Sequence, residues 1–177
     1  MLFTNRSLWT MLHGIVLGGG ALLALFAVVF SLRAMRPDTA PGAVPEAQAR
    51  YVVRLTVFTA VLLWLTVLVG TYITFPPYRA TPPEGTTDLS QYPRALIHSN
   101  PATVWLHAFG MEVKEHMPWI AAMLSTAVAF IGVRYRSRLL SDVQLNGMAT
   151  MLSVLSFMLV SFVALLGVFI NKVAPLE

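Results

Sequence analysis

The segment HAFGMEVKEHMPW, residues 107–119, gathers five titratable side chains: His107, Glu112, Lys114, Glu115 and His116. A neutral imidazole can ligate haem iron or another metal ion. Imidazole and carboxylate groups can also accept and deliver protons when a bound molecule is oxidised. The segment therefore predicts either a cofactor site or a surface that binds a partner protein.

Haem b is the first cofactor that we consider. His13 lies in an apolar run beside Gly14 and shortly before three further glycines, and small residues leave room for a planar macrocycle between helices. We predict His13 and His116 as the axial ligands of the haem iron, with His107 as the substitute ligand. Glu112 lies four residues before His116 and is placed to orient its ring. The competing interpretation is that His13 belongs to a helix-packing face and that His116 anchors a helix end.

A quinone is the second candidate. Its oxidation or reduction needs hydrogen-bonding and proton-accepting groups near the membrane interface, and Tyr72, Glu115 and His116 are of the right types. Tyrosine at an interface is also an ordinary membrane anchor. A copper site of imidazoles and thioethers is weaker, because His107 and His116 lie on different faces of the expected helix. A di-iron site lacks the second acidic helix that it would need.

Composition limits the class of protein. Of the 177 residues, 56% are hydrophobic and 11% are charged, whereas about a quarter of the residues of a soluble domain are charged. The absence of cysteine excludes disulfides, iron–sulfur clusters and covalently attached haem. The sequence contains no recognised hydrolase or nucleotide-binding motif, and its basic residues form no run typical of nucleic-acid binding. Whether the chain is an enzyme stays open, and a non-catalytic or electron-transfer subunit is favoured.

Four long apolar blocks predict membrane-spanning helices, because about 20 apolar residues cross the hydrocarbon as a helix. The expected fold is an all-α integral membrane protein, a four-transmembrane-helix bundle forming a single domain, 1–177. We expect the first block to be retained, because its strongest positive flank follows it. A helical extension should start at Asn100-Pro101 and lead the third span, with a bend near Pro118. The predicted spans are 9–32, 55–75, 117–135 and 148–170, with the outer loop and extension over 76–116.

Two connections contain many prolines. We expect residues 36–50 to be a little-structured linker and residues 75–94 to contain no regular helix. Arginines gather in the connections that follow the first and third spans. The positive-inside rule therefore places those connections in the cytoplasm and both termini on the periplasmic side of the cytoplasmic membrane.

These features predict a membrane subunit of a respiratory or photosynthetic electron-transfer complex that binds haem b or interacts with quinol near the outer face. Its partners would be lipids, other membrane subunits and a cytochrome c or similar redox protein, with no nucleic acid. The alternative is a cofactor-free docking subunit of such a complex. A transporter or sensor is less favoured, because the predicted spans contain no charged residue at their centres.

Overall fold

The computed structural model describes residues 4–36 and 45–175. All regular structure in these residues is helical, which confirms the predicted all-α class. Most of the expected linker, residues 37–44, lies outside the described ranges. Its last part, from Glu46 to Arg50, forms the first turns of a long helix rather than linker.

Four helices are long and apolar enough to cross a membrane, which indicates a multi-pass membrane protein. They extend beyond the predicted spans: Asn5–Ala34, Glu46–Tyr78, Leu106–Arg134 and Val143–Val173. Asp142 caps the fourth helix, since its side chain accepts hydrogen bonds from the backbone N–H groups of Gln144 and Leu145. The elements in chain order are α1 (Asn5–Met11), η1 (Leu12–Gly19), α2 (Gly20–Ala34), α3 (Glu46–Val69), η2 (Gly70–Thr74), α4 (Phe75–Tyr78), α5 (Pro93–His98), η3 (Leu106–Met111), α6 (Glu112–Arg134), α7 (Arg136–Leu139) and α8 (Val143–Val173).

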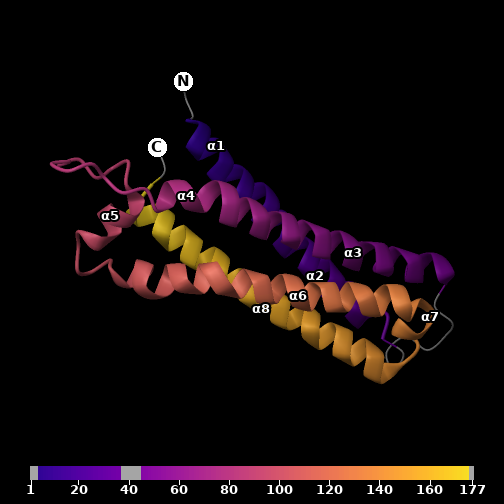
Figure 1. Cartoon of the computed structure of the whole chain (residues 1–177). Helices are drawn as coiled ribbons and strands as arrows, with labels where there is room; N and C mark the ends of the chain where they lie inside the picture. Colours follow the sequence, from indigo (N-terminus) through magenta and orange to yellow (C-terminus); the bar gives the residue numbers. More distant parts are fainter. Residues whose placement is uncertain (1–3, 37–44, 176–177) are drawn as a thin grey trace.

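The long helices form one bundle. Helix α6 packs against α3 and α8, and α2 packs against the same two helices, so the four form a closed ring. Both chain ends lie at the end of the bundle that carries α5, which we call the termini end (Figure 1). The short helix α7 lies at the opposite end, which we call the arginine end (Figure 1).

Small residues bring the helices close together. Ala21, Ala121, Ala122 and Ala149 are fully buried. A Cβ on Gly132 of α6 would lie 3.0 Å from Thr56 Oγ1 of α3. Hydrogen bonds also cross between helices: Ser156 Oγ to Ala121 O, Asn146 Nδ2 to Leu32 O, and Trp64 Nε1 to Thr126 Oγ1. Close backbones and interhelical polar contacts are typical of helices that pack in lipid.

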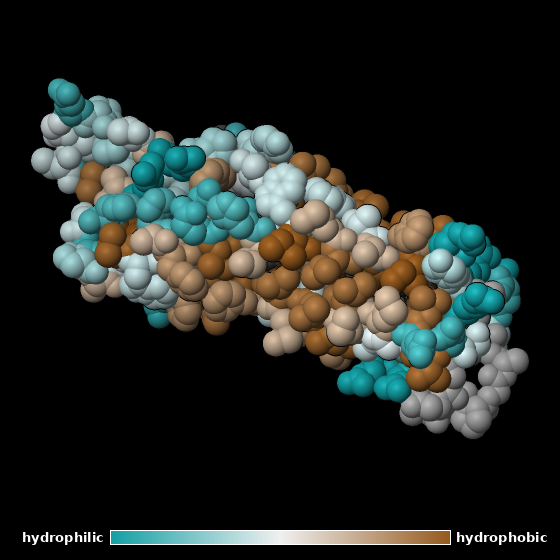
Figure 2. Space-filling model, turned by 60° about the horizontal axis from the view of Figure 1, so that its bottom comes forward, coloured by the Kyte–Doolittle hydropathy of each residue, from teal (hydrophilic) through white to brown (hydrophobic). Residues whose placement is uncertain are grey.

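The outside of the bundle is apolar along its middle. Figure 2 shows a hydrophobic band between two hydrophilic ends. Large side chains such as Leu23, Phe30, Phe130 and Met158 are exposed there. A continuous apolar belt of this kind suits contact with lipid rather than with water.

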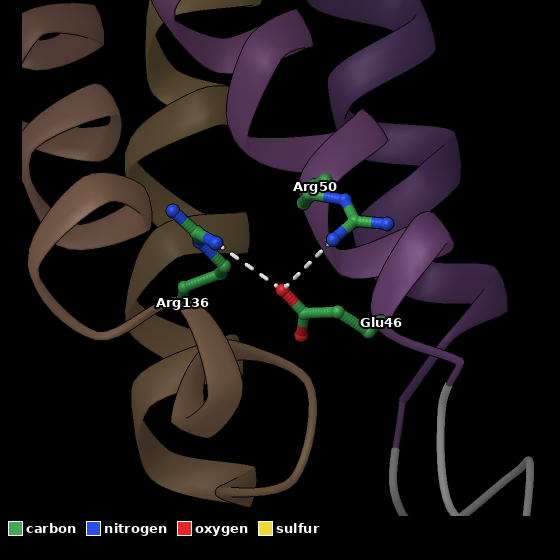
Figure 3. Close-up of polar contacts among 3 residues, drawn as sticks. All are labelled: Glu46, Arg50 and Arg136. Atoms are coloured by element: carbon green, nitrogen blue, oxygen red, sulfur yellow. Dashed lines mark hydrogen bonds and ion pairs between the residues drawn. The ribbon is translucent and has the colours of Figure 1, made fainter.

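At the arginine end, one carboxylate joins two elements (Figure 3). Glu46 Oε1 accepts a hydrogen bond from Arg136 Nη1 of α7 at 3.2 Å and lies 3.8 Å from Arg50 Nη1. All three side chains are about half exposed, so solvent screens the attraction.

The prediction of no regular helix over residues 75–94 is wrong at both ends of that segment. Helix α4 continues the second long helix through Pro76 and Pro77, and α5 begins at Pro93. Proline is tolerated in the first turn, where its missing N–H would have no helical partner. In the loop between these helices, Asp88 accepts a hydrogen bond from the Ser90 N–H, which lowers the pKa of its carboxyl.

The third long helix begins later than predicted. Asn100 Oδ1 accepts a hydrogen bond from Ala102 N, and residues 101–104 form turns instead of the expected first helical turns. Continuous helix starts near Leu106. The extension ahead of the apolar block is therefore present but shorter. Pro118 lies inside α6, and the helix continues through it.

Candidate functional site

A cavity of about 1120 Å³ lies in the termini end of the bundle. Small-molecule sites commonly occupy about 300–1,000 Å³, so this space is large enough for an extended ligand. All four long helices contribute to its wall. The apolar lining includes Leu63, Val67, Met111, Trp119, Val160, Val163 and Ala164, and the titratable lining consists of His13, Tyr78, Lys114, Glu115 and His116.

His13, on η1, lines this cavity and has one ring nitrogen without a hydrogen-bond partner among the described residues. The ring forms a hydrogen bond with the backbone of Thr66 on α3. Its Nδ1 atom is buried and has no hydrogen-bond partner. Nδ1 is therefore an unsatisfied polar atom inside the cavity wall, and the ring has to turn before this nitrogen can accept a hydrogen bond from a ligand.

Gly70 makes room for this ring. A Cβ built on Gly70 would lie 2.7 Å from His13 Cε1, closer than side-chain carbons approach in proteins. Any other residue at position 70 would therefore push the imidazole away from η2. The position of His13 thus depends on a glycine 57 residues later in the chain, which forms part of the second long helix.

Lys114, near the start of α6, brings a positive charge to the same cavity. A Cβ built on Gly167 of α8 would lie 2.8 Å from Lys114 Nζ, so the ammonium group lies against the α8 backbone. Among the described residues, no carboxylate forms an ion pair with it. Lys114 and His13 are near enough to interact electrostatically. An enclosed ammonium without a counterion is costly, and a ligand with electronegative oxygens would offset that cost.

The Glu112–His116 pair forms as predicted. His116 Nδ1 is hydrogen-bonded to Glu112 O at 2.8 Å and lies 4.0 Å from Glu112 Oε2. His116 and Glu115 line the cavity, whereas Glu112 does not. Both members of the pair are well exposed, with 70% of the His116 side chain and 60% of the Glu112 side chain accessible.

Two predicted site residues lie away from the cavity wall. Tyr72 is 69% exposed on the outside of the second long helix. His107 instead contacts Tyr78, whose hydroxyl lies 2.9 Å from His107 Nδ1. The ring of His98 lies 4.7 Å from the ring of His107, centroid to centroid. His13, His116 and Glu115 thus line one cavity, and His107, Glu112 and Tyr72 are not part of its wall.

Three π-helical segments surround the cavity. The segments η1, η2 and η3 interrupt three of the four long helices, and each contributes residues to the cavity wall. A π-turn widens a helix and displaces its side chains, and such turns occur frequently at functional sites. In η1 the change depends on glycine, because a Cβ on Gly18 would lie 3.2 Å from the carbonyl oxygen of His13.

Sequence reasoning missed Lys114 and Tyr78. The predicted third span began at Met117, which left Lys114 in the outer extension, outside the membrane-spanning bundle. The structure instead encloses Lys114 between α6 and α8. Its position three residues after Met111 and four before Pro118, both on the cavity wall, is the helical spacing that could have placed it.

The arrangement of His, Asp and Glu side chains in the described residues adds no support for a metal site. Among the described residues, no group of three or more His, Cys, Asp or Glu side chains is arranged to hold a metal ion. The di-iron interpretation therefore has no such cluster behind it in the described residues. Comparison of the chain with protein-family models, curated proteins and solved structures finds no match, so its function must be argued from the cavity itself.

Proposed function

We propose that this chain is a membrane subunit of an electron-transfer complex and that its cavity binds a quinone or quinol. The observation that carries this proposal is a mainly apolar cavity, lined by four membrane-length helices, with His13 and Lys114 in its wall. A quinone has a small polar headgroup with two oxygens and a long apolar tail. The cavity offers polar groups to the headgroup and an apolar wall to the tail.

The two polar side chains have complementary hydrogen-bonding capacities. Lys114 donates hydrogen bonds and has no acceptor, so it suits a quinone carbonyl oxygen. His13 Nδ1 has no partner among the described residues, so after a turn of the ring towards the cavity it suits the O–H of a quinol and can accept its proton. Oxidation of a quinol releases two protons and two electrons. The electrons would pass to a one-electron redox centre in a partner subunit.

The proposal also includes the orientation of the chain in the membrane. The positive-inside rule assigns the arginine end to the cytoplasm, which puts the cavity in the periplasmic half of the cytoplasmic membrane. A quinol there could reach the cavity from the lipid and deliver its electrons to a cytochrome c or similar protein outside. The exposed apolar band leaves surface for neighbouring membrane subunits as well as for lipid.

Haem b is the second candidate, because His13 and His116 both line the cavity. His116 keeps its Nε2 free, since the bond to Glu112 uses Nδ1. The two imidazoles come from different helices, as axial ligands of a haem between helices do. Under this alternative, the chain carries electrons itself rather than holding the quinol.

Titration with decylubiquinone separates the candidates. Trp119 lines the cavity, so quinone binding should quench its fluorescence in nanodiscs. We expect saturable quenching, and we expect Lys114→Met and His13→Ala each to weaken the affinity at least about tenfold, or ~1.4 kcal/mol. Lys172→Met is the matched control, because Lys172 is exposed and lies outside the cavity wall. A Soret band in the purified chain would favour haem, and a colourless chain without saturable quenching would favour the docking subunit.

A further inference from the structure

A row of three side chains leads from the cavity to the surface. Tyr78 is 6% exposed and lines the cavity. Its hydroxyl is 2.9 Å from His107 Nδ1. The His107 ring is 4.7 Å from the ring of His98, which is exposed to solvent. The three residues belong to α4, η3 and α5, so the row exists only because the connection folds back on the third long helix.

We propose that Tyr78, His107 and His98 form the path by which a proton leaves the cavity. This inference rests on the proposed quinol site and adds the route of its protons. A phenol and an imidazole each carry one transferable proton and one acceptor position. The Tyr78 oxygen takes a proton from the cavity as its own proton moves to His107 Nδ1. His107 then releases the proton on Nε2 towards His98 and the solvent.

The protons and electrons of quinol oxidation are all accounted for along this path and by the partner's redox centre. Each quinol O–H bond that breaks supplies one proton, and each proton ends on solvent water beyond His98. The two electrons go separately to a one-electron oxidant, which is the partner's redox centre in the cell. After one transfer His107 is neutral again but carries its proton on Nδ1, so a flip of the imidazole ring and a rotation of the Tyr78 O–H restore the starting arrangement before the second proton moves.

Several charged groups act on this row. Arg79, Arg94 and Glu112 act electrostatically on His107. Arg94 and Glu115 act on Tyr78. The rate of proton transfer will therefore depend on pH through these neighbours as well as through the histidines. For this reason the test uses an isotope effect at fixed pH rather than a pH profile alone.

Aromatic packing is the competing explanation of the same contacts. The rings of Phe75 and Tyr78 stack with centroids 6.1 Å apart. Tyr78→Phe preserves that stacking and removes the hydroxyl. His107→Gln preserves a hydrogen-bonding partner for Tyr78 but cannot relay a proton. A purely structural role would therefore survive both substitutions.

The experiment uses the chain in nanodiscs, loaded with decylubiquinol and mixed with ferricyanide in a stopped-flow instrument. We expect Tyr78→Phe and His107→Gln to slow oxidation of bound quinol at least about tenfold. We also expect a different rate ratio between H2O and D2O and a Kd within about twofold of the wild type. Tyr51→Phe, on an exposed tyrosine near the arginine end, is the control and should behave as the wild type.

Two outcomes would overturn the proposal, and they are distinguishable. If the wild-type chain shows no saturable binding of decylubiquinol, the quinol site fails and the path fails with it. If binding is intact and both variants oxidise the quinol at the wild-type rate with the same isotope ratio, the proton does not pass through this row and the quinol site stands.

Discussion

The imidazole ring of His13 occupies the space that a side chain at position 70 would need. A Cβ on Gly70 would lie 2.7 Å from the ring's Cε1 atom. This contact joins the first and second long helices at the cavity wall. The position of His13, a candidate ligand-binding group, therefore depends on the absence of a side chain at Gly70.

Gly70→Ala should therefore disturb both packing and binding. Overpacking of this kind typically costs about 1–3 kcal/mol of unfolding free energy. The displaced His13 ring should also bind decylubiquinone more weakly. Thermal unfolding in detergent and Trp119 quenching measure the two effects.

Gly19→Ala is the control for that substitution, because a Cβ at position 19 would meet no atom within 4 Å. Alanine is the better helix former by about 1 kcal/mol, so this variant should be as stable as the wild type or more so. Equal stabilities of Gly70→Ala and Gly19→Ala would contradict the tight contact with His13.

Removal of the Lys114 ammonium group should weaken quinone binding without lowering the stability of the fold. A partly buried ammonium group without a counterion is costly, so replacing it by an apolar side chain of similar length should be neutral or stabilising. We therefore expect Lys114→Met to unfold at the same temperature as the wild type or higher, while quinone affinity falls. A clearly lower melting temperature would show that the ammonium has a structural partner in the protein.

Gly167→Ala tests the position of that ammonium group. The new methyl group would lie 2.8 Å from Lys114 Nζ, and the flexible lysine can move away at little cost in stability. We expect near-normal melting and a measurably weaker affinity for decylubiquinone. Gly147→Ala, in the same helix with nothing within 4 Å of its Cβ, should leave the affinity unchanged.

The Glu46–Arg136 contact should contribute little to stability. An ion pair between half-exposed side chains typically contributes about 0–1 kcal/mol. We expect Glu46→Gln to lower the unfolding free energy by no more than about 1 kcal/mol, with the difference shrinking at high salt. Unfolding at low and high ionic strength measures this, and a large effect independent of salt would rule out a screened surface pair.

The proposed orientation can be tested by cysteine labelling, because the chain has no cysteine of its own. Ser90→Cys lies in the loop at the termini end, and Gln48→Cys lies at the arginine end. A membrane-impermeant maleimide should label Ser90→Cys in intact spheroplasts and Gln48→Cys only after permeabilisation. The reverse pattern would invert the topology and move the cavity to the cytoplasmic half.

The sequence alone determined the all-helical class of the fold and its four helices of membrane length. Long apolar blocks predict helices of membrane length whatever their partners. Lipid offers no hydrogen-bond partners, and a helix satisfies its own backbone N–H and C=O groups. The spacing of four residues predicted the Glu112–His116 pair, since neighbours on a helix are set by local geometry. His13 and His116 are the predicted pair of haem ligands, and both line the cavity.

The tertiary structure decided which of these groups share a site. Lys114 enters the cavity because Gly167 lets its ammonium group lie against α8, a contact 53 residues away in the chain. His107 leaves the predicted ligand set because the connection folds back and places Tyr78 beside it. Neither contact follows from helical periodicity. Both depend on how helices distant in sequence pack together, and small residues at single positions control that packing.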